Sequence, residues 1–165
     1  LADMPEEWFA LPQGADLSNP MIAGTAIQSA SRLMARGELE EADRAIRRLL
    51  HGSGNLLEIY RLELTCEAIY CALVLGRPKQ EAERLRTPEV RRYCKATQRY
   101  YPARVRQAYA WALLLENDIK AAGSLRTDFE RVAARSPYPG ELPSERMLLD
   151  QVDQAFQRKS TPTPQ

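Results

Sequence analysis

The chain has 165 residues, of which 44% are hydrophobic and 27% charged, a composition typical of a single globular domain that can bury its own core. Its formal net charge of +1 gives no overall argument for nucleic acid or a membrane surface as the partner. Leu, Ala, Arg and Glu are common and β-branched residues are sparse, so the composition favours an all-α fold.

Residues 1–18 are predicted to form an extended N-terminal strap. Pro5 and Pro12 prevent a long helix here, because proline cannot donate the backbone hydrogen bond that a helix interior needs. Trp8 and Phe9 are strongly apolar, so we expect them to dock on the helices that follow, with an exposed aromatic interface as the alternative.

Gly, Pro and Asn residues divide 19–158 into about seven or eight predicted helices. The segment from Asn55 to Gly76 is the central one, because its apolar side chains form stripes on two sides and must be covered on both. Asn55 is expected to cap its start, and Gly76 to end it with a positive φ. The predicted helices cover residues 20–36, 39–50, 55–75, 78–85, about 88–99, 102–116, 119–134 and 144–158.

The C-terminal end is predicted to consist of a helix capped by Ser144 and a disordered tail over 159–165. Uncharged runs such as Gln107–Leu115 are too short to span a bilayer, and no signal peptide is recognisable, so we expect a cytoplasmic location.

Three cysteines leave an odd thiol and lack the spacing of a metal site. We expect free, buried thiols in a reducing compartment, and no cofactor or metal. The residues concerned are Cys66, Cys71 and Cys94.

Turns recur about every 40 residues, at Gly37, Gly76 and Asn117, and each separates two predicted helices. An alanine follows each turn five or six residues later. This spacing predicts antiparallel helical hairpins stacked on one another. The alanines are Ala42, Ala82 and Ala122.

The residues around these turns resemble the tetratricopeptide repeat, in which a small residue ends the first helix of a pair and an alanine follows in the second. The second unit departs from that pattern by an extra residue and by Pro78, and the period is near 40 rather than 34. The resemblance covers about residues 19–135 and implies an α-solenoid. The matching positions are Ala30, Leu33, Gly37, Ala42 and Ile46 in the first unit and Trp111, Asn117, Ala122 and Phe129 in the third.

In such a fold the first helices of the hairpins form a concave wall that binds proteins or peptides. The resemblance therefore implies a binding surface formed by the predicted helices 20–36, 55–75 and 102–116.

A second resemblance concerns the opening, WFALPQGADLSNP, followed by a helical repeat, a Tyr-rich segment and LPSE. This order is similar to the soluble tail of bacterial membrane-embedded zinc proteases of the site-2 type. The chain has no HExxH motif and only one histidine, so the resemblance implies that this part binds a partner in the cytosol while the zinc chemistry lies elsewhere in the parent protein.

Candidate catalytic residues are few, and we expect no enzymatic activity. His51 precedes Ser53, but G-x-S-x-G is absent, and His51 is expected to interact with the last carbonyls of its helix. Glu63 and Glu67 lie one helical turn apart near Arg61, and can hold a buried polar group or a cationic ligand, although a solvated stripe is the commoner arrangement.

Charge is distributed unevenly along the chain, with a net −5 over residues 1–76 and +7 over 77–106. Basic side chains interleaved with tyrosines cluster over 84–106, a pattern that can bind an acidic protein, an anionic lipid surface or nucleic acid, or form a solvated face. We therefore predict a non-catalytic protein- or peptide-binding domain, with a nucleic-acid-associated helical protein as the alternative. The candidate partner-binding residues are Arg91, Arg92, Lys95, Arg99, Tyr100, Tyr101 and Arg104.

Overall fold

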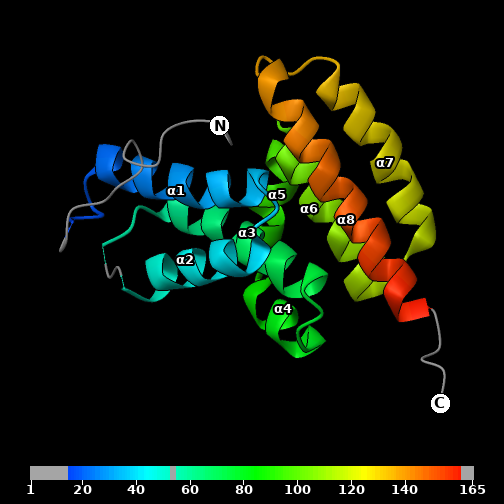
Figure 1. Cartoon of the computed structure of the whole chain (residues 1–165), viewed down its shortest axis with the longest axis horizontal. Helices are drawn as coiled ribbons and strands as arrows, with labels where there is room; N and C mark the ends of the chain where they lie inside the picture. The colour runs from blue at the N-terminus through cyan, green and yellow to red at the C-terminus, as the bar shows by residue number, and fades with distance from the viewer. Residues whose placement is uncertain (1–14, 53–54, 161–165) are drawn as a thin grey trace.

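The computed structural model describes residues 15–52 and 55–160, and all regular structure within these ranges is helical (Figure 1). The predicted all-α fold is confirmed. In chain order the elements are α1 (Pro20–Ala35), α2 (Leu39–Gly52), α3 (Glu58–Val74), α4 (Lys79–Leu85), α5 (Pro88–Thr97), α6 (Pro102–Ala110), the π-helix η2 (Trp111–Glu116), α7 (Ile119–Ala133), the short 3-10 turn η3 (Pro139–Glu141) and α8 (Leu142–Ser160).

Three helical hairpins make up most of the fold: α1 packs on α2, α3 on α4, and α6 on α7. In Figure 1, α1 and α2 lie on one side and α7 and α8 on the other, with α3 and α6 between them. α8 packs along α6 and also contacts α1. This last contact departs from an open solenoid, in which each unit touches only its sequence neighbours.

The three predicted turns all contain a left-handed residue: φ is 78° at Gly37, 73° at Gly76 and 57° at Asn117. After Gly37 and Gly76 the amide of the next residue donates to the carbonyl five residues earlier, Glu38 to Leu33 and Arg77 to Ala72, which is the Schellman arrangement that ends a helix. The alanine after each turn is buried, which lets the two helices of a hairpin approach closely. These alanines are Ala42, Ala82 and Ala122.

α3 is the central helix, as predicted, and contacts α2, α4, α5 and α6. From Leu64 to Val74 every side chain except that of Glu67 is buried. The start of the helix differs from the prediction, because Leu57 occupies the N-cap position with no side-chain hydrogen bond. Asn55 lies too far before the first turn to cap it.

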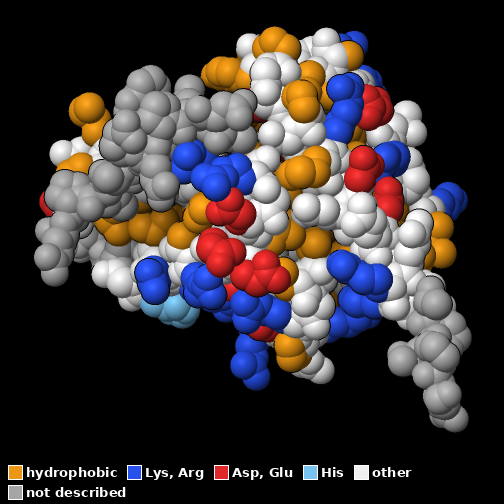
Figure 2. All heavy atoms as spheres, in the orientation of Figure 1, with side chains coloured by type: hydrophobic (Ala, Val, Ile, Leu, Met, Phe, Trp, Pro, Cys, Tyr) orange, Lys and Arg blue, Asp and Glu red, His pale blue; other side chains and the backbone are white. Residues whose placement is uncertain are grey.

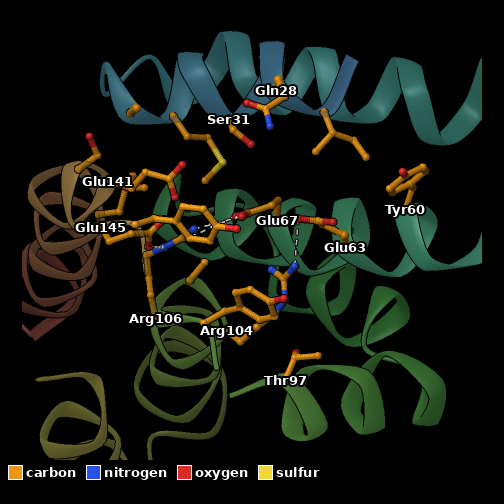
Figure 3. Close-up of a pocket in the computed structure, with 18 of the residues that line it drawn as sticks. Gln28, Ser31, Tyr60, Glu63, Glu67, Thr97, Arg104, Arg106, Glu141 and Glu145 are labelled. Atoms are coloured by element: carbon orange, nitrogen blue, oxygen red, sulfur yellow. Dashed lines mark hydrogen bonds and ion pairs between the residues drawn. The ribbon is translucent and has the colours of Figure 1, made fainter. Parts of the chain in front are cut away.

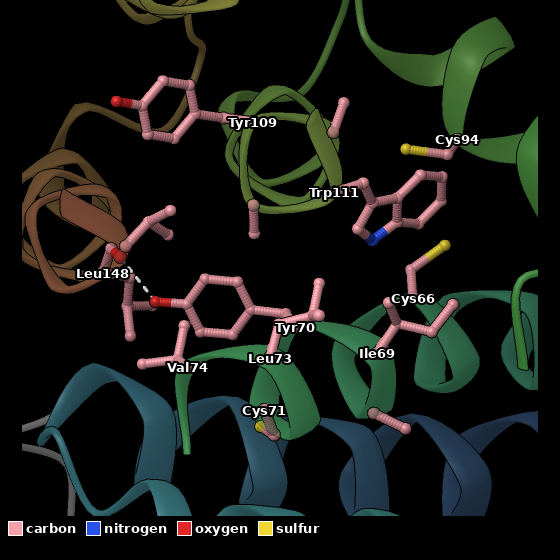
Figure 4. Close-up of a cluster of buried hydrophobic side chains, with 14 of the residues drawn as sticks. Cys66, Ile69, Tyr70, Cys71, Leu73, Val74, Cys94, Tyr109, Trp111 and Leu148 are labelled. Carbon is pink, nitrogen blue, oxygen red and sulfur yellow. Dashed lines mark hydrogen bonds between the residues drawn. The ribbon is translucent and has the colours of Figure 1, made fainter. Parts of the chain in front are cut away.

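The core around α3 combines large aromatic side chains with the cysteines (Figure 4). The hydroxyl of Tyr70 donates to the backbone carbonyl of Leu148, which ties α3 to α8. All three cysteines are buried and free, as expected. Cys66 of α3 and Cys94 of α5 lie near one another in Figure 4, and the neighbouring Cys94 thiol, together with burial, raises the pKa of Cys66.

Ion pairs connect α2 and α4 on the face shown in Figure 2, where acidic and basic side chains lie next to each other. Asp43 on α2 is completely buried and pairs with both Arg47, at 2.9 Å, and Arg77. Arg47 in turn pairs with Glu81 of α4. A buried carboxylate of this kind is tolerated only because two cations neutralise it.

The ends of the chain lie partly outside the described residues, which include neither 1–14 of the predicted strap nor 161–165 of the predicted tail. Ser144 does not cap the last helix, because α8 already begins at Leu142 and continues to Ser160. Two residues assigned to the tail are therefore helical. None of the helices in the described part of the chain combines the length and the apolarity that crossing a membrane requires.

Candidate functional site

A pocket of about 550 Å³ lies between α1, α3, α5, α6 and the start of α8 (Figure 3). The three helices that the sequence predicted as a binding wall, α1, α3 and α6, all line it. The pocket is therefore assembled from segments that are distant in the sequence, and each helix contributes one face.

α1 forms one side of the pocket with a mixed polar and apolar face. The lining residues of α1 are neighbours in the sequence or lie one helical turn apart, so they share one side of the helix. They include Ile27, Gln28, Ser31 and Met34. In Figure 3 the side chains of Gln28 and Ser31 point from α1 into the pocket. They present amide and hydroxyl groups to whatever occupies the space.

α3 contributes two carboxylates, Glu63 and Glu67, which are four residues apart and so face the same way. The side chain of Glu67 is only 13% exposed, so the expectation of a solvated stripe is wrong for this residue. The alternative stated from the sequence, a carboxylate pair that holds a buried polar group, describes the structure: Glu63 pairs with Arg104 and Glu67 with Arg106.

Arg106 is the centre of the buried charge cluster and is 1% exposed. Its Nη1 and Nη2 each donate to Glu67 at 3.1 Å, and its Nε donates to Glu145 of α8 at 2.7 Å. The guanidinium also lies over the ring of Tyr70, 4.4 Å from the ring centroid. One arginine therefore joins α3, α6 and α8 behind the pocket.

The pKa values within this cluster reflect burial and pairing. Burial alone would raise the pKa of Glu67, but the charge of Arg106 and its hydrogen bonds outweigh burial and lower that pKa below its ordinary value. Burial alone would lower the pKa of Arg106, but Glu145 and Glu67 raise it well above its ordinary value. Glu67 and Arg106 therefore both remain charged at neutral pH.

Arg104, a candidate partner-binding residue, is 5% exposed and so does not belong to an exposed basic face. Its Nη2 lies 3.1 Å from Glu63 and donates to the hydroxyl of Tyr93 at 3.3 Å, while Nη1 donates to Gln107 at 3.1 Å. Residue 104 faces inward because it lies on the side of α6 that packs on α3 and α5. It forms part of the pocket lining instead.

The other candidate residues lie on an exposed surface formed by α5 and the turn after it. Arg92 pairs with Glu89 at 3.4 Å, and the guanidinium of Arg99 lies 4.7 Å from the ring centroid of Tyr100. Only Tyr101 also reaches the pocket. The exposed members are Arg91, Arg92, Lys95, Arg99, Tyr100 and Tyr101.

Sequence reasoning missed Arg106, Glu145, Glu141 and Tyr138 as residues of the site. One signal was available: Arg106 begins an apolar stripe that continues four and seven residues later, and a charge in such a stripe indicates a buried ion pair. No comparable signal marks Glu145 of α8, because its importance comes from its ion pair with Arg106 of α6.

His51 lies in the last turn of α2 and is exposed, and Ser53 is outside the described ranges. Within 15–52 and 55–160, no group of three or more His, Cys, Asp or Glu side chains is arranged to hold a metal ion.

Comparison with known proteins does not identify a family, so the site is interpreted from its geometry. No protein-family model matches the chain, and no curated protein or solved structure is significantly similar to it.

Proposed function

We propose that this chain is a non-catalytic helical-repeat domain of tetratricopeptide-like hairpins that binds a peptide segment of a partner protein in the pocket between α1, α3 and α6. The observation that carries the proposal is the pocket itself, which is about 550 Å³ in volume and lined by the wall that the repeat pattern predicts.

Exposed apolar side chains around the pocket support a peptide over a small molecule as the ligand. Ile59 is 57% exposed, Tyr101 48% and Tyr138 57%, and all three line the pocket. Aromatic and aliphatic groups at a rim extend the contact area beyond the cavity, which a small ligand does not require but a peptide segment uses. The amide of Gln28 and the hydroxyl of Ser31 add hydrogen-bonding groups for a peptide backbone.

A selection from a phage-displayed random peptide library, followed by fluorescence polarisation with the selected peptides, tests the proposal. The variant Ser31→Trp fills the pocket from α1 and is expected to weaken peptide binding about tenfold or more. Ser124→Trp, on the exposed side of α7, places the same ring away from the pocket and is expected to leave affinity unchanged.

Selected peptides that bind Ser31→Trp as tightly as the wild-type chain would overturn the pocket assignment, and failure to select any peptide would overturn peptide binding. Thermal unfolding of both tryptophan variants checks that neither has lost its fold.

A second candidate function follows from the exposed basic surface of α5, which remains suited to an acidic protein, an anionic surface or nucleic acid. Within the described residues Arg91 and Lys95 have no acidic partner, and only Glu89 faces Arg92. Against nucleic acid, Arg104 and Arg106 are already neutralised by glutamates, which leaves fewer cations for phosphates.

A labelled oligonucleotide tests this alternative, with binding measured over a range of salt concentrations. The double reversal Arg91→Glu/Arg92→Glu is expected to abolish any salt-dependent binding, while Arg131→Glu/Arg135→Glu on and after α7 serves as the matched control. Equal oligonucleotide binding by the two variants would exclude α5 as the binding surface.

We also propose that the domain serves as the cytosolic regulatory tail of a membrane-embedded zinc protease. The support is the order of sequence features described above: the WFALPQGADLSNP opening, the helical repeat and the LPSE segment. The coding sequence upstream of Leu1 tests this proposal, because hydrophobic spans with an HExxH motif are expected there.

A further inference from the structure

The charges that line the pocket are not balanced. Among the described residues, four glutamates line it but only two arginines, and both arginines are already paired with glutamates. Glu67 and Glu145 share Arg106, and Glu63 pairs with Arg104. Glu141 has no ion-pair partner among the described residues. The pocket therefore carries an excess of negative charge when it is empty.

The two resident arginines are held in the same way, which shows how this site binds a cation. Arg106 is paired with carboxylates and lies 4.4 Å from the ring centroid of Tyr70. Arg104 is paired with Glu63 and lies 5.2 Å from the ring centroid of Tyr93. In both, a carboxylate neutralises the guanidinium while the face of a tyrosine covers it.

A third set of the same groups lies at the start of α8, where Glu145 is already paired with Arg106 but Glu141 has no cation among the described residues. Tyr101, Tyr138, Glu141 and Glu145 line a small cavity of about 50 Å³ beside the main pocket. In the described part of the chain, no arginine or lysine lies over the ring of Tyr101 or Tyr138. Figure 3 shows Glu141 and Glu145 together at the end of the pocket formed by α8.

We propose that this cavity, the Tyr101–Tyr138 subsite, binds a lysine or arginine side chain of the peptide segment that occupies the main pocket. This inference rests on the proposed function and gives the chemical class of the partner: a segment with a basic residue at this position. Glu141 supplies the counter-charge from its position just before the first turn of α8.

An NMR titration of the 15N-labelled chain with n-butylguanidinium and n-butylammonium tests the subsite. Both cations are expected to shift resonances of residues around Tyr138 in a saturable manner, whereas n-butylurea, a neutral isostere of the first, is expected to shift them far less. Glu141→Gln should weaken binding of the cations at least about threefold. The matched control is Glu83→Gln on α4, which removes an exposed charge away from the pocket.

Two variants test how much the aromatic ring of Tyr138 contributes to binding of the cations. Tyr138→Leu is expected to weaken binding about threefold, while Tyr138→Phe keeps the ring face and should retain affinity. Equal binding of n-butylurea and the cations would overturn the inference, as would equal effects of Glu141→Gln and Glu83→Gln.

The two proposals fail separately. If library peptides bind in a manner sensitive to Ser31→Trp but unaffected by Glu141→Gln, peptide binding stands and the cation subsite falls. If the cations bind as expected but no peptide is selected, the subsite stands and the peptide proposal falls.

Discussion

Arg106 and Glu67 form a bidentate ion pair inside the helical domain, with both guanidinium nitrogens 3.1 Å from a carboxylate oxygen. The two residues come from α6 and α3, and Glu145 adds a third helix to the same guanidinium. A buried charge that loses its partner strongly destabilises a fold. The ion pairs of Arg106 therefore favour the arrangement in which α3, α6 and α8 pack together.

Arg106→Met is expected to lower the free energy of unfolding by about 3–5 kcal/mol, because it leaves two carboxylates in the interior without their cation. Urea unfolding followed by circular dichroism measures this change. Arg131→Met, at an exposed position on α7, is the control and should change stability by less than about 0.5 kcal/mol. A loss in Arg106→Met as small as that of the control would contradict the role of the pair.

The lowered pKa of Glu67 predicts a dependence of stability on acid pH. A carboxylate whose pKa is lower in the folded than in the unfolded chain stabilises the fold above its ordinary pKa of 4.5, and that contribution is lost as the pH falls through the folded-state pKa. Glu67→Gln should therefore be less stable than the wild type at neutral pH, and the gap should narrow in acid. Urea midpoints over this pH range provide the measurement, and a gap independent of pH would refute the linkage.

The left-handed turn at Gly76 and the helical Gly24 form a matched pair for testing backbone strain. A Cβ added at either position meets no atom within 4 Å, so sterics beyond the backbone do not contribute. Gly76→Ala should destabilise by roughly 1 kcal/mol because φ is 73° there, whereas Gly24→Ala in the interior of α1 should stabilise by about 0.5–1 kcal/mol. Thermal unfolding of the two variants is expected to shift in opposite directions, and shifts of the same sign would contradict the turn geometry.

The hydroxyl of Tyr109 is expected to lose its proton at a higher pH than that of an ordinary tyrosine. Burial and its hydrogen bond to Asp153 raise the pKa of its hydroxyl to about 12. Since the pKa is raised on folding, the stabilisation is complete below the ordinary value of 10.0 and is lost as the pH rises through about 12. The difference between wild type and Tyr109→Phe in absorbance at alkaline pH isolates this group. Asp153→Asn should bring its titration to lower pH, and an unchanged titration would remove Asp153 as a cause.

Local sequence determined the helices and their turns. Gly37, Gly76 and Asn117 could be identified in advance because only glycine and asparagine readily adopt a positive φ, and that requirement lies within a few residues of chain. The central position of α3 was equally predictable, since a helix that is apolar on two sides must be covered on both. The cap predictions at Asn55 and Ser144 were wrong because α3 begins only at Glu58, with Leu57 at its N-cap, and α8 already begins at Leu142.

Only the tertiary structure decided which charges are free and which are buried. Arg104 and Arg99 look alike in a basic segment, yet one is held by Glu63 across the domain and the other is exposed. The partners of Arg106 are 39 residues away in both directions along the chain, on helices that meet it only in the folded domain. Helical periodicity reports which face of a helix is apolar, but a buried ion pair depends on two faces meeting. The pocket and its excess of carboxylates therefore exist only at the level of packed helices.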